Sequence, residues 1–389
     1  MENRPQRVKK AIGLESFVFL GLMLGFFSLF IVQMGFVNAL STMMQTAFRL
    51  LTDTVFFLTA IAVLAGALSG LLQEFGVIAL VDYLLTPLMK PLFGMPGAAS
   101  IGAITTYMSD NPAILALAAD RNYRNYFKKY QVPALTNLGT GFGMGAIITT
   151  FMLGLSALTG ENYLPAALVG NLGAVVGSIV STRIMLRFTA KMYGRQEEAV
   201  NDAGQAMDRK VRVVREGSAA SRFLEAMLDG GKVGVQMGID IIPGVLVICT
   251  LVMMLTGGPN ESGQFTGAAY EGIGLLPRLG EALEFLLKPL FGLQSAQGIA
   301  VPITALGSSG ASLSIISRLI SSGLAGPHDI AVFTAMCMCW SGYLSTHVAM
   351  VNALGYSHLT GKAILSHTIG GVAAGVFAHW AYTLLAMVL

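Results

Sequence analysis

The stretch KPLFGM at residues 90–95 recurs as KPLFGL at residues 288–293, so the two copies lie 198 residues apart. The same spacing aligns SDNPA at 109–113 with GSSGA at 307–311. Several matches in order at one spacing are the signature of a duplicated architecture. The sequence therefore predicts two related halves joined in one chain.

The composition places both halves in a lipid bilayer. Of the 389 residues, 54% are hydrophobic and 12% are charged, whereas a soluble domain carries about 25% charged residues. The stretches 16–48, 54–73, 241–260 and 363–389 contain no Asp, Glu, Lys or Arg. Each reaches the length of about 20 residues that a helix needs to cross a membrane. A multi-pass membrane protein is predicted. The basic residues flank the spans, so we expect no nucleic-acid partner.

The expected fold class is an all-α polytopic membrane protein. It has two inverted-topology repeats, each with an amphipathic arm, a re-entrant helical hairpin and transmembrane helices. We assign residues 1–35 to an N-terminal anchor span and 36–188 to the first repeat. A charged cytoplasmic linker at 189–222 and a second repeat at 223–389 follow.

The orientation of the repeats follows from the distribution of positive charge. The Gly/Pro-interrupted segments at 96–119 and 294–320 could each cross the membrane or return to the same side. Cytoplasmic loops carry an excess of Lys and Arg. The basic loop at 121–129 and the linker both lie inside only if 96–119 is a hairpin. The loop at 257–272, which has no Lys or Arg, then lies outside. This places the N-terminus inside, the protein in the cytoplasmic (inner) membrane, and the two hairpins on opposite faces. Spans are expected at 132–157 and 163–186 after the first hairpin, and at 329–350 and 362–386 after the second.

Interrupted helices at membrane depth require burial in protein or a water-filled cavity. Inverted repeats with paired broken helices place a solute and ion site near the membrane midplane. Asp110 is the sharpest candidate, because a carboxylate inside the membrane is costly and is functional by default. It would bind Na⁺ or carry a proton. The full set of expected solute-binding or ion-binding residues is Ser109, Asp110, Asn111, Asn137, Thr140, Ser308, Ser309, His347 and His367. For each of them, a helix cap or a small polar packing residue is the structural alternative.

No metal site, disulfide or bound cofactor is expected, apart from a coupling Na⁺ or H⁺. Cys249, Cys337 and Cys339 form no CxxC pair. No G-x-x-x-x-G-K-[ST] phosphate loop is present, so no fused nucleotidase would drive the protein. The expected partners are a small polar solute and the lipid bilayer, and the sequence is compatible with a homo-oligomer.

The layout of arm, hairpin with a polar tip, and two spans resembles the nucleoside-recognition (Gate) domain. FLEAMLDGGKVG at 223–234, followed by IIPGVLVI, is similar to the opening of such a unit. The whole chain resembles fused spore maturation proteins A and B and, more distantly, concentrative nucleoside transporters. The resemblance implies a gated or elevator-like carrier whose hairpin tips hold the solute. The Gln-Thr-Glu signature of the nucleoside carriers is replaced here by Ser109-Asp110-Asn111, which puts a nucleoside substrate in doubt.

We therefore expect a secondary transporter (permease) and not an enzyme. One alternative is a non-transporting membrane protein of envelope or spore maturation, in which the hairpin tips are packed and dry. Another is a rhomboid-like intramembrane serine protease using Ser309 and His367, because GSSG at 307–310 fits GxSG and His367 lies one span further on. The protease alternative lacks an upstream histidine, since no histidine precedes His328.

Overall fold

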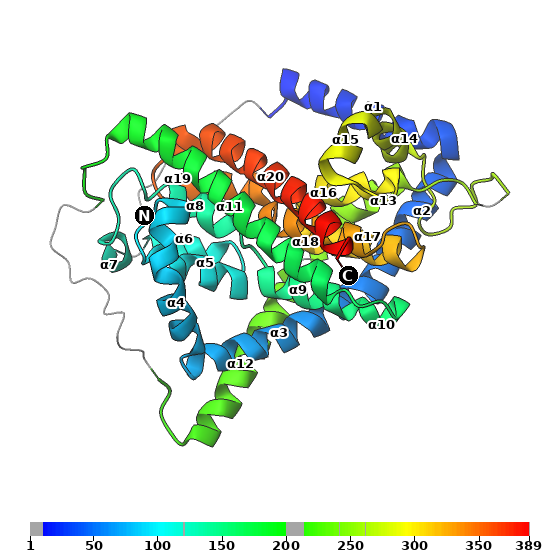
Figure 1. Ribbon diagram of the computed structural model, residues 1–389. Helices are drawn as coiled ribbons and strands as arrows, with labels where there is room; N and C mark the ends of the chain where they lie inside the picture. The colour runs from blue at the N-terminus through cyan, green and yellow to red at the C-terminus, as the bar shows by residue number, and fades with distance from the viewer. Residues whose placement is uncertain (1–10, 120, 200–213, 241, 261, 389) are drawn as a thin grey trace.

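The computed structural model describes residues 11–119, 121–199, 214–240, 242–260 and 262–388. The regular elements among these residues are α-helices with short 3₁₀ and π segments (Figure 1). The described part of the chain contains no β-strand, only a bridge between Lys128 and Glu198. The all-α class predicted from the sequence is confirmed.

Several helices have the length and composition of membrane spans. They are Leu14–Met34, which is α1, Ala134–Thr159, Leu164–Tyr193, which is α11, and Ser357–Ala386. A bent pair, Ala62–Glu74 with Ala79–Phe93, is also long and apolar enough to form a span. Only 11% of the 18-residue apolar stretch of α1 is buried in the protein. Most of this helix is therefore available to contact lipid. The chain is a polytopic membrane protein.

The helices follow one another in the same order in both halves. The first half contains α2 (Phe36–Arg49), η1 (Leu50–Val55), α3 (Phe56–Glu74), α4 (Val77–Leu88), η2 (Met89–Phe93), α5 (Ala99–Met108), α6 (Pro112–Ala119), α7 (Arg121–Arg124), α8 (Ala134–Thr140), α9 (Gly145–Gly154), α10 (Ser156–Thr159) and α11. The second contains α12 (Ala219–Asp240), η3 (Gly244–Cys249), α13 (Thr250–Thr256), α14 (Leu275–Ala282), α15 (Glu284–Phe291), η4 (Ala296–Ile299), α16 (Ala300–Ala305), α17 (Ser309–Ser321), α18 (Pro327–Cys339), α19 (Tyr343–Ala353), η5 (Ser357–Leu359) and α20 (Thr360–Ala386). Helices α11 and α12 extend into the expected linker 189–222 from its two ends.

The spacing of 198 residues recurs in the backbone itself. The arm from Val77 to Phe93 corresponds to the arm from Leu275 to Phe291. Left-handed backbone, which glycine adopts at least cost, also recurs at this spacing. The pairs are Gly76 with Gly274, Gly94 with Gly292, and Met144 with Gly342. The similarity between the halves therefore extends well beyond the KPLFG motif.

Two spans that the sequence predicted as continuous are interrupted in their middle. The expected span 132–157 breaks between α8, which ends at Thr140, and α9, which begins at Gly145. The expected span 329–350 breaks between α18, which ends at Cys339, and α19, which begins at Tyr343. Left-handed backbone at Met144 and Gly342 turns the chain at both breaks. Glycines therefore accompany the helix ends at both breaks.

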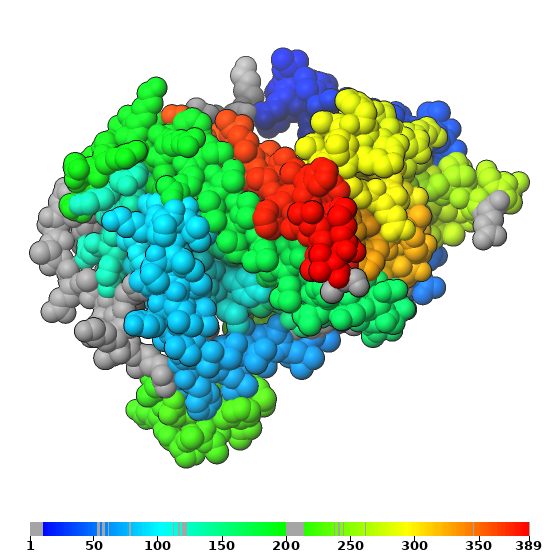
Figure 2. Space-filling view, viewed as in Figure 1, coloured from blue at the N-terminus to red at the C-terminus, as the bar shows by residue number. Residues whose placement is uncertain are grey.

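The two halves meet where α11 and α20 cross. These helices run antiparallel and side by side (Figure 1), and they adjoin on the face of the molecule shown in Figure 2. A Cβ atom added to Gly177 would lie 2.6 Å from the Gly370 carbonyl oxygen, and one added to Gly370 would lie 2.6 Å from the Gly177 carbonyl oxygen. Small residues allow membrane helices to approach this closely.

The basic loop and the linker, which were expected on the same side of the membrane, lie together. Lys129 Nζ lies 2.5 Å from Glu197 Oε1, and Lys128 pairs with Glu198. The bonded Glu197 carboxylate raises the pKa of the Lys129 ammonium. Because the segment 121–129 contacts the start of the linker, both segments lie on the same side of the membrane. This arrangement fits a hairpin at 96–119 rather than a helix that crosses the membrane.

The end of α3 makes a second set of ion pairs with the linker. Glu74, whose side chain is only 4% exposed, pairs with Arg215 at 2.8 Å and with Arg222 at 2.7 Å. These contacts join the end of α3 to the last part of the linker.

Candidate functional site

Four chain breaks converge between the two halves. They are the hairpin tips at 109–111 and 307–309 and the helix breaks at 141–144 and 340–342, which together we name the four-break site. The Asn111 side-chain amide donates a hydrogen bond of 2.5 Å to the Ser341 carbonyl oxygen. A Cβ atom added to Gly143 would lie 2.4 Å from Asn111 Oδ1 and 2.7 Å from Ser341 Cβ. The first tip and both helix breaks are therefore in direct contact.

The second hairpin tip joins the same place through the α18–α19 break. The backbone N–H of Gly342 donates to the Ala305 carbonyl oxygen at 3.0 Å. The Ser309 hydroxyl donates to the Cys337 carbonyl oxygen. Both bonds connect α16 and α17 to α18 and α19, so the two tips approach the break at 340–342 from two sides.

The tips are packed in this conformation. Asn111 is fully buried and Ser309 is 2% exposed, whereas Ser109, Asp110 and Ser308 are half-buried. The Asp110 carboxylate accepts a bond of 2.7 Å from the backbone N–H of Asn111. The Ser308 hydroxyl accepts from the backbone N–H of Ala311 at 3.2 Å, so it caps α17. Ser308 therefore has a structural role as a helix cap, whether or not it also contacts solute.

Several buried polar atoms at the site have no hydrogen-bond partner among the described residues. They are Asn111 Oδ1, Thr140 Oγ1, Trp340 Nε1 and His347 Nε2. Leaving a buried polar group unpaired costs about 1–3 kcal/mol, and such groups are rare in native proteins. Seven further buried side-chain atoms without a partner are distributed over the rest of the described residues. The four at or beside the breaks at 141–144 and 340–342 are available to a polar ligand or water.

A hydrogen-bonded relay lies next to the four-break site. The Asn137 amide donates to Ser181 Oγ at 3.0 Å and to the Ala363 carbonyl oxygen at 2.9 Å. Ser181 Oγ lies 2.9 Å from His367 Nδ1, and His367 Nε2 contacts the Cys339 carbonyl oxygen. The relay brings together two expected residues, Asn137 and His367, that are far apart in the sequence.

The structure adds two serines that the expected set left out. Ser341 receives the Asn111 amide on its carbonyl, and Ser181 connects Asn137 to His367. Both are buried. Serines are also common packing residues in membrane helices, so the sequence offered no signal that separates these two from the rest.

The expected residues therefore fall into two adjacent groups. Ser109, Asp110, Asn111, Thr140, Ser308 and Ser309 lie at the four-break site or border it, while Asn137, His347 and His367 lie around the relay. The His347 and His367 ring centroids are 4.6 Å apart. The Cys339 carbonyl, at the end of α18, connects the relay to the break at 340–342.

The pair required for a serine protease does not form. Both ring nitrogens of His367 contact other groups, Ser181 Oγ and the Cys339 carbonyl oxygen. The Ser309 hydroxyl donates to the Cys337 carbonyl oxygen. A nucleophile and its base must lie within hydrogen-bond reach of each other, so this geometry disfavours the rhomboid-like alternative.

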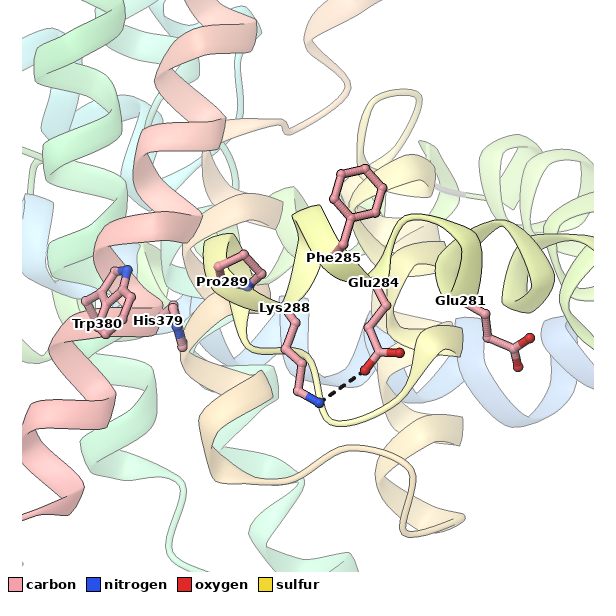
Figure 3. A pocket seen from close by; sticks show the side chains of 7 residues that line it. All are labelled: Glu281, Glu284, Phe285, Lys288, Pro289, His379 and Trp380. Carbon is pink, nitrogen blue, oxygen red and sulfur yellow. Dashed lines mark hydrogen bonds and ion pairs between the residues drawn. The ribbon is translucent and has the colours of Figure 1, made fainter.

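A shallow pocket on the outer side of the second arm is separate from this site. Figure 3 shows its lining residues, Glu281, Glu284, Phe285, Lys288, Pro289, His379 and Trp380, with the ion pair of 3.1 Å between Lys288 and Glu284. The Glu281 carboxylate points away from His379 in this view. None of the nine expected site residues lines this pocket.

The fold and the site define a class: all-helical membrane proteins with paired helical hairpins and interrupted spans. A scan against known protein families finds no match. An uncharacterized protein of Alkalihalophilus pseudofirmus is 25% identical over 132 residues, which is 34% of this chain and 28% of that relative. The chain therefore matches under a third of that relative's length.

Among solved structures, the chain is similar to CNTnw, a concentrative nucleoside transporter. Its inward-facing, substrate-bound structure aligns with a TM-score of 0.52 at 15% identity, covering 82% of this chain and 74% of CNTnw. A double variant in an outward-facing state aligns with a TM-score of 0.54 at 14% identity, covering 94% and 83%. This chain has a nucleoside-transporter-like fold.

Proposed function

We propose that this protein is a secondary transporter (permease) that moves a small polar solute across the cytoplasmic membrane, coupled to Na⁺ or H⁺. The solute binds between the two hairpin tips at the four-break site. The observation that carries the proposal is the convergence of four chain breaks around buried polar atoms that have no hydrogen-bond partner among the described residues. Two Gate-like repeats, inserted in opposite orientations, supply two breaks each.

The physical argument rests on what a helix break provides. Each break leaves backbone N–H and C=O groups without partners inside the helix, and lipid cannot satisfy them. Broken helices at the repeat interface are the usual place for solute and ion sites in carriers. The same fold occurs in CNTnw in structures named inward-facing and outward-facing, which supports movement between two such states here.

Proteoliposome uptake of a panel of polar solutes, with and without Na⁺ and pH gradients, tests this function. The panel includes nucleosides because of the fold, and also amino acids, carboxylates and small bases. Accumulation of one solute that depends on an ion gradient is expected. If no solute accumulates under any gradient, the carrier proposal is wrong.

The Asp110→Asn variant is expected to lower ion-driven uptake of that solute at least about tenfold. Loss of one favourable charged contact of about 1.5–3 kcal/mol is worth this factor or more. The measurement is the initial rate at saturating and at zero ion gradient. Glu161→Gln, which removes an exposed carboxylate in the loop before α11, is the matched control. Uptake by Asp110→Asn with unchanged ion dependence would remove Asp110 from the site.

The proposed topology predicts which single cysteines an impermeant maleimide reaches from outside. The three native cysteines are buried, so only introduced ones should react in intact cells. Ser262→Cys and Glu161→Cys are expected to be labelled from outside, and Lys128→Cys only after the membrane is opened. Labelling of Lys128→Cys and Ser262→Cys from the same side would contradict the inverted repeats and, with them, the carrier.

The non-transporting alternative has one observation in its favour. The hairpin tips are closely packed, with Asn111 and Ser309 buried, as a scaffold of envelope or spore maturation would require. A carrier in a closed state shows the same packing. Thiol labelling distinguishes the two alternatives. Cysteines introduced at Ser109 and Ser308 should change their rate of reaction with a maleimide when solute is added to a carrier. In a scaffold, these rates should stay the same.

A further inference from the structure

Two buried histidines lie at the contact between α19 and α20. His347 and His367 are both fully buried, and their ring centroids are 4.6 Å apart. Tyr343 contacts both rings, with centroids 5.8 Å from His347 and 5.1 Å from His367. Because the two titratable rings are in contact and buried, their existing hydrogen bonds determine which ring nitrogen can bind a proton.

The hydrogen bonds of His367 hold it in one neutral form. The Cys339 carbonyl oxygen can only accept, so Nε2 of His367 carries the hydrogen. The Nδ1 atom then accepts from the Ser181 hydroxyl at 2.9 Å. Ser181 Oγ in turn accepts from the Asn137 amide. Every member of this relay is satisfied with a neutral imidazole, so the relay leaves no vacant nitrogen on His367.

His347 is held differently. The Tyr343 carbonyl oxygen, 3.1 Å away, can only accept, so Nδ1 of His347 carries the hydrogen. The Nε2 atom therefore has a lone pair. That atom is buried and has no hydrogen-bond partner among the described residues. It is the one ring nitrogen of the pair that can bind a proton without breaking an existing hydrogen bond.

The elements packed most closely against α19 are α6, α8, η5 and α20. Their titratable side chains besides His367 are His358, Lys362, His379 and Tyr382. His358 contacts the Tyr193 hydroxyl at 2.7 Å, and Lys362 lies over the Phe188 ring. His379 bonds to His328, whose ring centroid lies 5.9 Å from that of Tyr382. On α19 itself, Tyr343 bonds to Thr368 at 2.7 Å. None of these elements contains Asp or Glu. Asp110 lies two residues before α6, at the hairpin tip, where its carboxylate accepts from the backbone N–H of Asn111. A buried charge without a partner is strongly unfavourable, so a protonated His347 disfavours the packed state.

The first half provides an internal comparison. Thr149 lies 198 residues before His347, and Asn171 lies 196 residues before His367. These two residues also contact each other, since the Asn171 amide donates to Thr149 Oγ1 at 2.9 Å. A tyrosine, Tyr107, bonds to Asn171 at 2.9 Å. The equivalent place in the first half therefore holds a polar pair that cannot titrate.

Resting on the proposed carrier function, we propose that His347 is the proton-binding residue and that the coupling ion is H⁺. When the four-break site opens, a proton from water adds to Nε2 and forms the imidazolium, with Nδ1–H still bonded to Tyr343. When the site packs again, the uncompensated charge drives the proton off to the side that is then accessible. Ser181 and Asn137 are positioning residues that keep His367 neutral.

The first test measures proton binding without any solute. The full chain, labelled with ¹⁵N in its five histidines, is studied by NMR in lipid between about pH 8 and pH 5. We expect one buried imidazole, identified by its loss in His347→Gln, to change from the Nδ1–H form to the imidazolium. The His367 signal should keep its Nε2–H form throughout. A His347 that stays neutral down to the pH of unfolding overturns the proposal, whatever the protein transports.

A second variant keeps the test valid if His347→Gln fails to fold. The double variant His347→Thr with His367→Asn introduces the pair that the first half already accommodates as Thr149 and Asn171. It should remove the same titrating signal. A titrating buried signal that persists in this variant assigns the proton to another histidine and overturns the proposal.

The functional readout is the pH profile of uptake, measured with the solute that wild type accumulates in the panel. His347→Gln is expected to lose at least about tenfold of the acid-driven stimulation and to give a flat profile. His358→Gln, which changes a surface histidine, should keep the wild-type profile. Uptake by wild type that follows Na⁺ and ignores pH would refute the proton assignment and leave the carrier intact. Titration of His347 without uptake of any solute would instead refute the carrier.

Discussion

The Gly143→Ala variant is expected to lose at least about tenfold of its solute uptake while remaining folded. The added methyl group would lie 2.4 Å from Asn111 Oδ1 and 2.7 Å from Ser341 Cβ, so the first hairpin tip and the break at 340–342 must both move away from the break at 141–144. Overpacking of this kind costs about 1–3 kcal/mol, and 1.4 kcal/mol corresponds to a factor of ten. Initial uptake rates and thermal unfolding in detergent are the measurements.

Gly25→Ala is the control for this prediction. Gly25 lies in the membrane span α1, and a Cβ atom there would meet nothing within 4 Å. Its uptake and its unfolding temperature should match wild type. Wild-type uptake by Gly143→Ala would show that Asn111 and Ser341 can move away from the break at 141–144 without consequence, and the four-break site would then not be the solute site.

The Gly370→Leu variant is expected to destabilise the whole fold by about 3 kcal/mol or more. A Cβ atom at this position would lie 2.6 Å from the Gly177 carbonyl oxygen and 2.7 Å from Ser181 Cβ. The carbonyl belongs to the backbone of α11 and cannot rotate aside, so α11 and α20 must separate. Overpacking costs of this size are at the upper end for a single substitution. The unfolding temperature and the folded yield after extraction are the measurements.

Gly361→Leu tests whether the effect comes from the helix crossing rather than from the loss of a glycine. Gly361 lies in the same helix, α20, where an added Cβ atom would meet nothing within 4 Å. This variant should keep the wild-type unfolding temperature. Equal stability of Gly370→Leu and Gly361→Leu would mean that the α11–α20 crossing does not hold the halves together.

The duplication explains why the two halves are alike in backbone and different in chemistry. Left-handed residues, arm lengths and helix breaks recur at a spacing of 198 residues because equivalent helices in the two halves pack in the same way. The side chains at the equivalent places have diverged, with Asn111 against Ser309 at the tips and Thr149 against His347 beside the breaks. A carrier needs the two halves to open alternately, but only one of them has to bind the coupling ion.

Part of the site could be read from the sequence and part could not. The hairpin tips were predictable because Ser109-Asp110-Asn111-Pro112 interrupts an apolar segment and its counterpart lies at the repeat spacing. The helix breaks at 141–144 and 340–342 were missed, because glycines inside a membrane helix usually serve packing. The direction in which Asn111 and His367 point was also beyond reach, since it depends on where other helices cross.

By itself, the sequence determined the all-helical membrane class, the duplication and the positions of the two hairpins. Hydropathy, charge and repeats are properties of neighbouring residues or of a fixed spacing, so they can be counted along the chain. Only the tertiary structure decided that Asn111 meets Ser341 and that Asn137, Ser181 and His367 form one relay. The partners in the Asn111 contact are 230 residues apart, and the close crossing of α11 and α20 brings such distant groups together.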